Sequence, residues 1–286
     1  MPIKIENLVY IYQKGTPFEK SALKGFSLTV NDGETIGIMG ATGSGKSTLL
    51  QLLNGLLQPA AGTITIDGLL LGGMKKASLA KLRQQVAMVF QYPEQQIFEE
   101  HVYDEVAFGP INMGLDAQAV EERVIKALIQ VGLDPAVYRK RSTANLSGGE
   151  KRRLAIAGML ASEPRYLLLD EPSAGLDPEM RVLLFENMSE LNRLEKMTII
   201  MVSHHLSDLL ALCSRIIVLD NGQLVLDVAS SKMLDSSEQL AQLGVDLTPA
   251  QQVVQQLKQR GWGITRSPRN PEEAGRLIVE KLANKL

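Results

Sequence analysis

The stretch Gly40-Ala41-Thr42-Gly43-Ser44-Gly45-Lys46-Ser47 matches the pattern G-x-x-x-x-G-K-[ST]. It follows an apolar run at residues 35–39 that is typical of a buried strand, and it opens a predicted helix over 47–57. Glycines allow successive backbone N–H groups to point at phosphate oxygens, and the helix N-terminus adds partial positive charge. The stretch therefore predicts that the chain binds a nucleoside triphosphate.

Two side chains of this loop have distinct expected roles. Lys46 can bridge the terminal phosphates, and the Ser47 hydroxyl can bind Mg²⁺. We count the next residue, Thr48, among the nucleotide-binding residues as well. The motif does not identify what the bound nucleotide is used for.

Four further apolar runs, at residues 86–90, 166–170, 198–202 and 216–220, resemble the run before the loop. Continuous aliphatic runs are typical of a parallel sheet that is covered on both faces. Periodic segments between them, such as 181–194, can supply the crossover helices. The sequence therefore predicts an α/β fold.

The remaining segments indicate smaller units around this sheet. Residues 3–12 and 21–30 alternate loosely across a Gly-Thr-Pro turn, as an antiparallel pair does, and 62–68 is another short strand. Residues 92–160 are mainly helical in pattern, with Val120, Val124, Leu128 and Val131 at helical spacing. After residue 221 Gln and Ser become more frequent, and one more helix is predicted over 249–259. We expect one large domain over 1–225 and a C-terminal extension over 226–286.

Composition excludes several classes of protein. The 286 residues include 45% hydrophobic and 22% charged residues, as in an ordinary globular protein that can bury a core. The formal net charge is −2, which is unlike a nucleic-acid binder, so no nucleic-acid partner is expected. A single cysteine, Cys213, permits no disulfide within the chain. No signal peptide and no membrane span is apparent.

Two acidic residues end one of the buried strands. Asp170 and Glu171 close the run at 166–170. Asp170 can complete the coordination of Mg²⁺. Glu171 points elsewhere and is the candidate to orient or deprotonate an attacking water. The alternative is that both acids only cap a loop before Pro172.

A second glycine motif, Leu146-Ser147-Gly148-Gly149-Glu150, precedes a predicted helix over 151–160. A Ser-Gly-Gly turn at a helix N-terminus offers amide groups and a dipole to an anion. Taken alone this signal is weak, because many helices begin with serine and a turn. Its place between the phosphate loop and Asp170 makes it informative.

The motifs together resemble an ATP-binding cassette (ABC) ATPase over residues 3–225. They occur in the order typical of that family: the loop at 40–47, Gln91, the signature 146–149, Asp170-Glu171, the segment Ala174-Gly175-Leu176-Asp177, and His204. The resemblance implies a P-loop NTPase fold with a RecA-like parallel sheet, an antiparallel β subdomain, a helical signature subdomain over about 92–160 and a small C-terminal extension.

The resemblance also implies the roles of individual residues and the cofactors ATP and Mg²⁺. Tyr12 resembles the aromatic residue that stacks on adenine, although it can also be an ordinary edge-strand aromatic. Gln91 resembles the glutamine that contacts Mg²⁺ and senses the membrane partner, and His204 the histidine that contacts the γ-phosphate. Ser147, Gly148 and Gly149 resemble the signature that caps the γ-phosphate of the opposite subunit, with Asp177 at the subunit interface. Two chains are thus expected to enclose two ATP molecules.

A narrower resemblance is to the ATPases of energy-coupling factor transporters, of the second of their two types. The segments that carry it lie at residues 89–100, 104–110 and 152–158. It implies import of vitamins or transition-metal ions at the cytoplasmic face of the cell membrane. It also implies three partners: a sister ATPase, a membrane-embedded coupling protein and a separate substrate-binding membrane protein. Ala41, His101 and Glu150 depart from the residues expected of that type.

Three points stay open at this stage. A homodimeric ATPase of a cobalt or nickel importer and a soluble, non-transport ABC ATPase are the alternatives to a heterodimeric importer subunit. Ile97, Phe98 and Val102 can form an apolar groove for an amphipathic coupling helix, or they can pack into the core. Residues 226–286 resemble the family's dimerisation extension.

Overall fold

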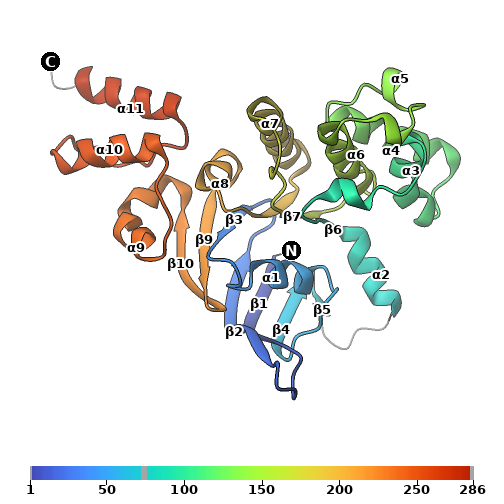
Figure 1. The fold of residues 1–286 in the computed structure, drawn as a ribbon, viewed down its shortest axis with the longest axis horizontal. Helices are drawn as coiled ribbons and strands as arrows, with labels where there is room; N and C mark the ends of the chain where they lie inside the picture. The colour runs from blue at the N-terminus through green and yellow to red at the C-terminus, as the bar shows by residue number, and fades with distance from the viewer. Residues whose placement is uncertain (1, 72–75, 284–286) are drawn as a thin grey trace.

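The computed structural model describes residues 2–71 and 76–283, and its centre is a six-stranded sheet with the order β10-β9-β3-β8-β7-β6 (Figure 1). The strands are β3 (Thr35–Met39), β6 (Val86–Val89), β7 (Tyr166–Asp170), β8 (Thr198–Val202), β9 (Arg215–Asp220) and β10 (Gln223–Ala229). All neighbours are parallel except β10, which pairs antiparallel with β9. Every residue of β3, β6, β7 and β8 is buried. The predicted parallel sheet is confirmed.

A second, antiparallel sheet has the order β2-β1-β4-β5. Its strands are β1 (Ile3–Tyr12), β2 (Lys20–Val30), β4 (Ala61–Ile66) and β5 (Leu69–Leu71). Helix α1 (Lys46–Leu53) shares one hydrophobic core with this sheet and with one face of the central sheet, through residues such as Ile5, Leu49 and Ile200. The antiparallel pair and the third strand were predicted, whereas β5 was not.

The opposite face of the central sheet is covered by helices. Crossover helix α7 (Pro178–Glu195) and helix α8 (Leu206–Leu212) pack there, and α2 (Lys76–Gln85) leads into β6. Helix α7 extends the predicted segment 181–194 at both ends. Helix α1 is shorter than the predicted 47–57, because Asn54 caps it and Gly55 turns the backbone to a φ of 70°.

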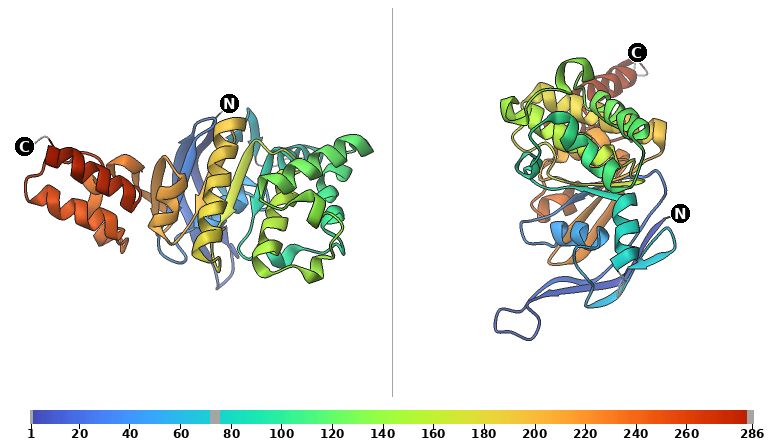
Figure 2. Two further views of the ribbon diagram at one scale, coloured as in Figure 1. Left: turned by 90° about the horizontal axis from the view of Figure 1, so that it is seen from above. Right: turned by 90° about the vertical axis from the view of Figure 1, so that its right-hand side faces the viewer.

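A mainly helical segment lies beside β6 and extends the molecule at one end (Figure 2). Its elements are η1 (Pro93–Gln96), α3 (Val102–Asn112), α4 (Ala117–Gln130), α5 (Pro135–Tyr138), η2 (Thr143–Asn145) and α6 (Gly148–Leu160). The four apolar residues at helical spacing in the sequence, Val120, Val124, Leu128 and Val131, are all buried. This segment also joins the core over the central sheet.

The C-terminal part lies at the other end of the molecule (Figures 1 and 2). It contains η3 (Ser230–Ser236), α9 (Ser237–Gln242), α10 (Pro249–Gln259) and α11 (Pro271–Ala283). Of helices α10 and α11 the sequence predicted only α10; α11 has a single buried residue, Ala274. A small core of Leu234, Val254, Ile264 and Ala274 joins η3, α10 and α11. Strand β10 runs across residue 225, so the exact boundary of the extension stays a prediction.

Candidate active site

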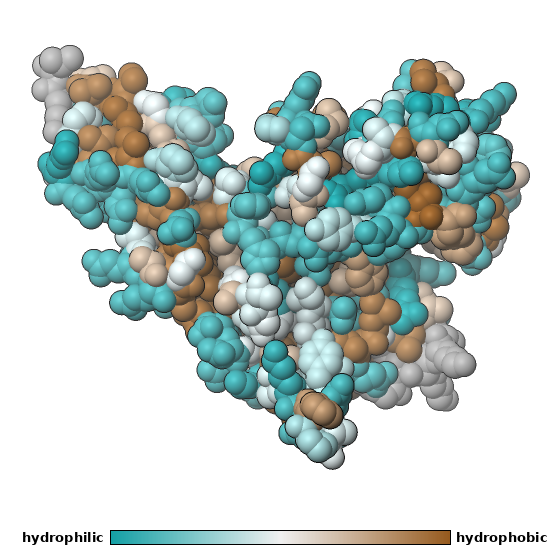
Figure 3. Space-filling model, in the orientation of Figure 1, coloured by the Kyte–Doolittle hydropathy of each residue, from teal (hydrophilic) through white to brown (hydrophobic). Residues whose placement is uncertain are grey.

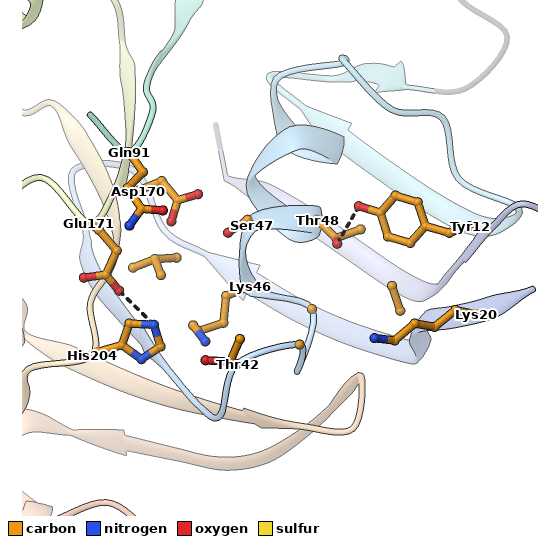
Figure 4. A pocket seen from close by; sticks show the side chains of 14 residues that line it. Tyr12, Lys20, Thr42, Lys46, Ser47, Thr48, Gln91, Asp170, Glu171 and His204 are labelled. Atoms are coloured by element: carbon orange, nitrogen blue, oxygen red, sulfur yellow. Dashed lines mark hydrogen bonds and ion pairs between the residues drawn. The ribbon is translucent and has the colours of Figure 1, made fainter. Parts of the chain in front are cut away.

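Four loops meet at one edge of the central sheet, because the carboxyl ends of parallel strands lie together. The phosphate loop follows β3, Gln91 follows β6, Asp170 and Glu171 end β7, and His204 follows β8. They surround a cavity of about 310 Å³ (Figure 4). The lining residues are Tyr12, Lys20, Ala22, Thr42, Gly43, Gly45, Lys46, Ser47, Thr48, Gln91, Asp170, Glu171, Val202 and His204.

The backbone of the phosphate loop needs glycine at two positions. Gly40 has a φ of 143°, and a Cβ there would lie 2.0 Å from the carbonyl oxygen of Leu219. Gly45 has a φ of 108°, and a Cβ there would lie 2.6 Å from the carbonyl oxygen of Ala22. Gly45 is also the N-cap of α1 and contributes no side-chain cap, and the first turn of α1 contains no acidic residue. The helix N-terminus thus keeps its positive end for an anion.

The predicted loop residues Gly40, Ala41 and Ser44 do not line the cavity themselves. The first two act through their carbonyl groups, which accept hydrogen bonds of 2.8 and 3.0 Å from the Lys46 amine. Burial lowers the pKa of Lys46, while the charges of Glu171 and Asp170 oppose this shift. The Lys46 amine is therefore held against the phosphate loop, close to the carboxylates of Asp170 and Glu171.

Asp170 and Ser47 form an oxygen-rich corner of the cavity. Burial raises the pKa of Asp170, and a hydrogen bond with the Ser47 side chain lowers it. Within residues 2–71 and 76–283, no group of three or more His, Cys, Asp or Glu side chains could hold a metal ion. Mg²⁺ prefers oxygen ligands and binds through one or two carboxylates together with phosphates and water, so this corner fits Mg²⁺ only in the company of a nucleotide.

Glu171 is a buried carboxyl group without a hydrogen-bond partner for Oε1. Burial, and then the charge of Asp170, raises the pKa of Glu171 to about 7. The Nε2 atom of His204 lies 3.5 Å from Oε1 (Figure 4). The backbone of Glu171 adopts a φ of 51°, a left-handed conformation that non-glycine residues take rarely. Burial lowers the pKa of His204, which favours neutral imidazole.

Tyr12 and Lys20 stand on the other side of the loop. They are register partners at the ends of β1 and β2. The Tyr12 hydroxyl lies 3.0 Å from the Thr48 hydroxyl (Figure 4). The Tyr12 ring packs edge-on against Tyr10. The Lys20 amine lies 3.8 Å from the position of a Cβ on Gly43. Sequence reasoning missed Lys20, because only the strand register places it beside the loop.

Ser147, Gly148, Gly149 and Asp177 do not line this cavity. Ser147 is the N-cap of α6: its hydroxyl accepts a hydrogen bond from the Glu150 N–H, and the Glu150 carboxylate accepts one from the Ser147 N–H. Asp177 is the N-cap of α7 and accepts a hydrogen bond of 2.9 Å from the Met180 N–H. The structure thus leaves the signature away from the phosphate loop of its own chain, and its predicted role across a subunit interface stays a prediction.

Glu150, which replaces a more common glutamine, has local partners. Its carboxylate accepts hydrogen bonds from the Tyr138 hydroxyl at 2.6 Å and from the Ser147 N–H at 2.7 Å. These contacts, with the Tyr138 bond the largest cause, lower the pKa of Glu150 to about 2. The acid therefore completes a capping box at the start of the signature helix.

Comparison with known proteins supplies the family. The model of a protein family described as "ABC transporter" matches residues 23–174 of this chain. The chain belongs to the ABC transporter family. This ABC chain is 45% identical over 285 residues to the energy-coupling factor transporter ATP-binding protein EcfA2 of Symbiobacterium thermophilum, covering 100% of the chain and 98% of that protein. It is 41% identical over 284 residues to EcfA2 of Clostridium perfringens, covering 99% of each. The predicted resemblance to these ATPases is confirmed.

Solved structures agree with this ABC assignment. One is cbiO1 from Clostridium perfringens, described as part of the ABC transporter complex cbiONQ, with 33% identity, a TM-score of 0.75 and coverage of 90% of this chain and 98% of that one. Another is a dimeric ATP-binding cassette bound to ADP and Pi, with 27% identity, a TM-score of 0.72 and coverage of 79% and 98%. The predicted P-loop NTPase fold is confirmed.

Proposed function

We propose that this chain is the ATP-hydrolysing subunit of an energy-coupling factor importer. The observation that carries the proposal is the convergence of Lys46, Asp170, Glu171 and His204 on one cavity behind an intact phosphate loop. The relatives that match nearly the whole chain are named as ATP-binding proteins of energy-coupling factor transporters. An ABC fold with these groups in place is equipped for hydrolysis as well as binding.

The residues of the cavity divide the reaction between them. The loop N–H groups and Lys46 hold the β- and γ-phosphates, and Ser47, Asp170 and Gln91 would hold Mg²⁺, which when bound would neutralise charge on the phosphate oxygens. Glu171 accepts a proton from water as the water oxygen bonds to the γ-phosphorus and the bond to ADP breaks. A carboxyl group whose pKa is about 7 suits this task near neutral pH. His204, beside Glu171, donates a hydrogen bond to the γ-phosphate.

The signature residues of this chain act on the nucleotide that a second chain binds. Ser147, Gly148 and Gly149 lie outside this chain's own cavity, and each glycine leaves open space where a Cβ would stand. They are free to approach the γ-phosphate on the phosphate loop of a partner, with Asp177 at the same interface. The partner is a sister ATPase in a heterodimer; a homodimer is the alternative arrangement.

A second hollow, of about 330 Å³, is the docking groove for the membrane-embedded coupling protein. Its lining includes Pro93 and Gln96 of η1, the segment that directly follows Gln91. At its rim Phe98 and Phe108 are exposed and stack edge to face with ring centroids 4.8 Å apart. Exposed apolar surface also gathers over this helical segment in Figure 3. An amphipathic helix with apolar anchors fits such a groove.

Only part of the apolar stretch predicted for this groove belongs to it. Phe98 lines the groove, whereas Val102 is fully buried in the main core and Ile97 packs against that core.

The chain reaches the membrane through a partner in this proposal. No helix among the described residues is long and apolar enough to cross a bilayer. Its proposed place is the cytoplasmic face of the cell membrane, powering uptake of a vitamin or metal ion that a separate membrane protein recognises.

The test is affinity purification of the tagged chain from detergent-solubilised native membranes. We expect a second ABC ATPase and multi-span membrane proteins to co-purify. The variant Phe98→Ser with Phe108→Ser should lose the membrane proteins and keep the ATPase partner. Ile129→Ser, which changes an exposed apolar residue of α4 outside the groove, is the matched control. Recovery of ribosomal proteins or nucleic acid instead would overturn the importer assignment and leave a non-transport ABC ATPase.

A further inference from the structure

A buried carboxylate beneath the active site joins three segments of the chain. Asp208, in α8, is 3% exposed. Its Oδ1 atom accepts a hydrogen bond of 2.6 Å from Nη2 of Arg181. Its Oδ2 atom accepts hydrogen bonds of 2.5 Å from the Ser173 hydroxyl and 3.3 Å from the Ser203 hydroxyl. Asp208 itself does not line the nucleotide cavity.

Each of these partners belongs to a segment that carries a group of the active site. Ser173 lies two residues after Glu171, in the loop that leads to α7. Ser203 directly precedes His204, and its hydroxyl also accepts a hydrogen bond of 3.0 Å from the N–H of His205. Arg181 lies in the first turns of α7, the helix that Asp177 caps. One carboxylate therefore ties together the ends of β7 and β8 and the start of α7.

The energetics favour a fixed arrangement. Ser173 and Ser203 are both buried, with exposed fractions of 4% and 0%, so water does not compete for their hydroxyl groups. Hydrogen bonds to an ionised acceptor are shorter and about twice as strong as neutral ones. A buried carboxylate is stable only when it is paired and hydrogen-bonded, and Arg181 together with the two hydroxyls meets that need.

We propose that Asp208 is a positioning residue. It fixes where Glu171 and His204 lie relative to each other and to the bound nucleotide, and it does not contact the nucleotide itself. The inference rests on the proposed hydrolysis of ATP. Displacing a catalytic group by about 1 Å can cost about 10²-fold in rate. Loss of the hydrogen bonds to Asp208 therefore lowers turnover, while binding of ATP by the phosphate loop and Tyr12 is unaffected.

The test compares steady-state MgATP hydrolysis by the full chain and its variants, with its partner ATPase if the wild-type chain needs one. Asp208→Ala should lower kcat by about 10–100-fold and leave KM for ATP within about twofold. Ser173→Ala combined with Ser203→Ala should reproduce this fall in kcat with the Asp208–Arg181 ion pair still present. Asp227→Asn is the matched control, because it breaks a bidentate Asp–Arg pair with Arg215 far from the cavity.

The outcomes separate the two proposals. If the wild-type chain hydrolyses no MgATP in its complex, the proposed function fails. If it does, and both sets of variants retain the kcat of Asp227→Asn, the positioning role is wrong. A parallel rise in KM and fall in kcat would also refute it, because that pattern indicates general damage to the site. The serine variants leave the buried charge paired, so they keep the test decisive should Asp208→Ala fail to fold.

Discussion

Replacing Glu171 with glutamine separates binding from hydrolysis. The substitution keeps the size of a side chain that is 7% exposed, and removes its negative charge and its ability to take a proton. A positioned general base contributes about 10²–10⁴-fold to rate, and its efficiency is greatest when its pKa lies near the working pH. The pKa of Glu171, raised to about 7 chiefly by burial, meets that condition. We therefore expect kcat to fall by about 10²–10⁴-fold.

The same structure predicts what the substitution leaves intact. Oε1 of Glu171 has no hydrogen bond to lose. Because the pKa of Glu171 is higher in the folded chain than in the unfolded chain, ionisation of this group destabilises the fold, and the penalty grows as the pH rises through 4.5 towards 7. Glu171→Gln should therefore be at least as stable as the wild-type chain at pH 8, and should bind ATP with similar affinity.

Three measurements decide this prediction: phosphate release, equilibrium binding of a fluorescent ATP analogue, and thermal unfolding at pH 8. Glu150→Gln is the matched control, because it makes the same chemical change outside the cavity and restores the residue more common in the family. Turnover of Glu171→Gln within about threefold of the control would contradict the general-base role, which requires at least about 10²-fold. A large loss of ATP affinity would contradict the claim that the two functions separate.

Four further predictions follow from the site. Wild-type kcat should fall about tenfold per pH unit below about pH 7, where Glu171 takes up a proton, and this dependence should disappear in Glu171→Gln, as a pH–rate profile would reveal. Tyr12→Ala should weaken ATP binding by roughly 1–3 kcal/mol with little change in maximal rate, whereas unchanged affinity in titration calorimetry would place base stacking elsewhere. Lys20→Gln should weaken binding of ATP by roughly 0.2–1 kcal/mol and that of adenosine not at all, with Lys24→Gln on the same strand as control. Ser147→Ala should lower the free energy of unfolding by about 1 kcal/mol through loss of the α6 cap, which denaturant titration measures.

The features that could be predicted from sequence are those with local signals. Continuous aliphatic runs such as 166–170 mark strands buried on both faces, and the glycine-rich loop marks its own conformation, because only glycine tolerates the backbone at Gly40 and Gly45. The strand ends then bring Gln91, Asp170 and His204 together, since parallel strands share an edge.

The features that could not be predicted depend on contacts between distant segments. Lys20 reaches the cavity only because β2 pairs with β1 in a particular register. The tie through Asp208 joins residues up to 35 positions apart, and no local pattern marks it. Helix α11 was missed although Ala274, Leu277 and Ile278 recur at helical spacing, so a local signal for it was present. Whether Val102 lines a groove or packs into the core stayed open, since a hydrophobic residue alone does not reveal which surface it faces, and the structure places it in the core.

The capping box at Ser147 determines which hydrogen-bonding groups of this turn remain available to a ligand. The Ser147 N–H and one lone pair of its oxygen are both committed to Glu150. A hydroxyl has a single proton to donate, and accepting the Glu150 N–H leaves that proton available to another acceptor. Together with the amides of Gly148 and Gly149 it forms a patch made of donors. Such a patch favours an anion, so the proposed contact with the γ-phosphate of a partner would use donors that this chain supplies by itself.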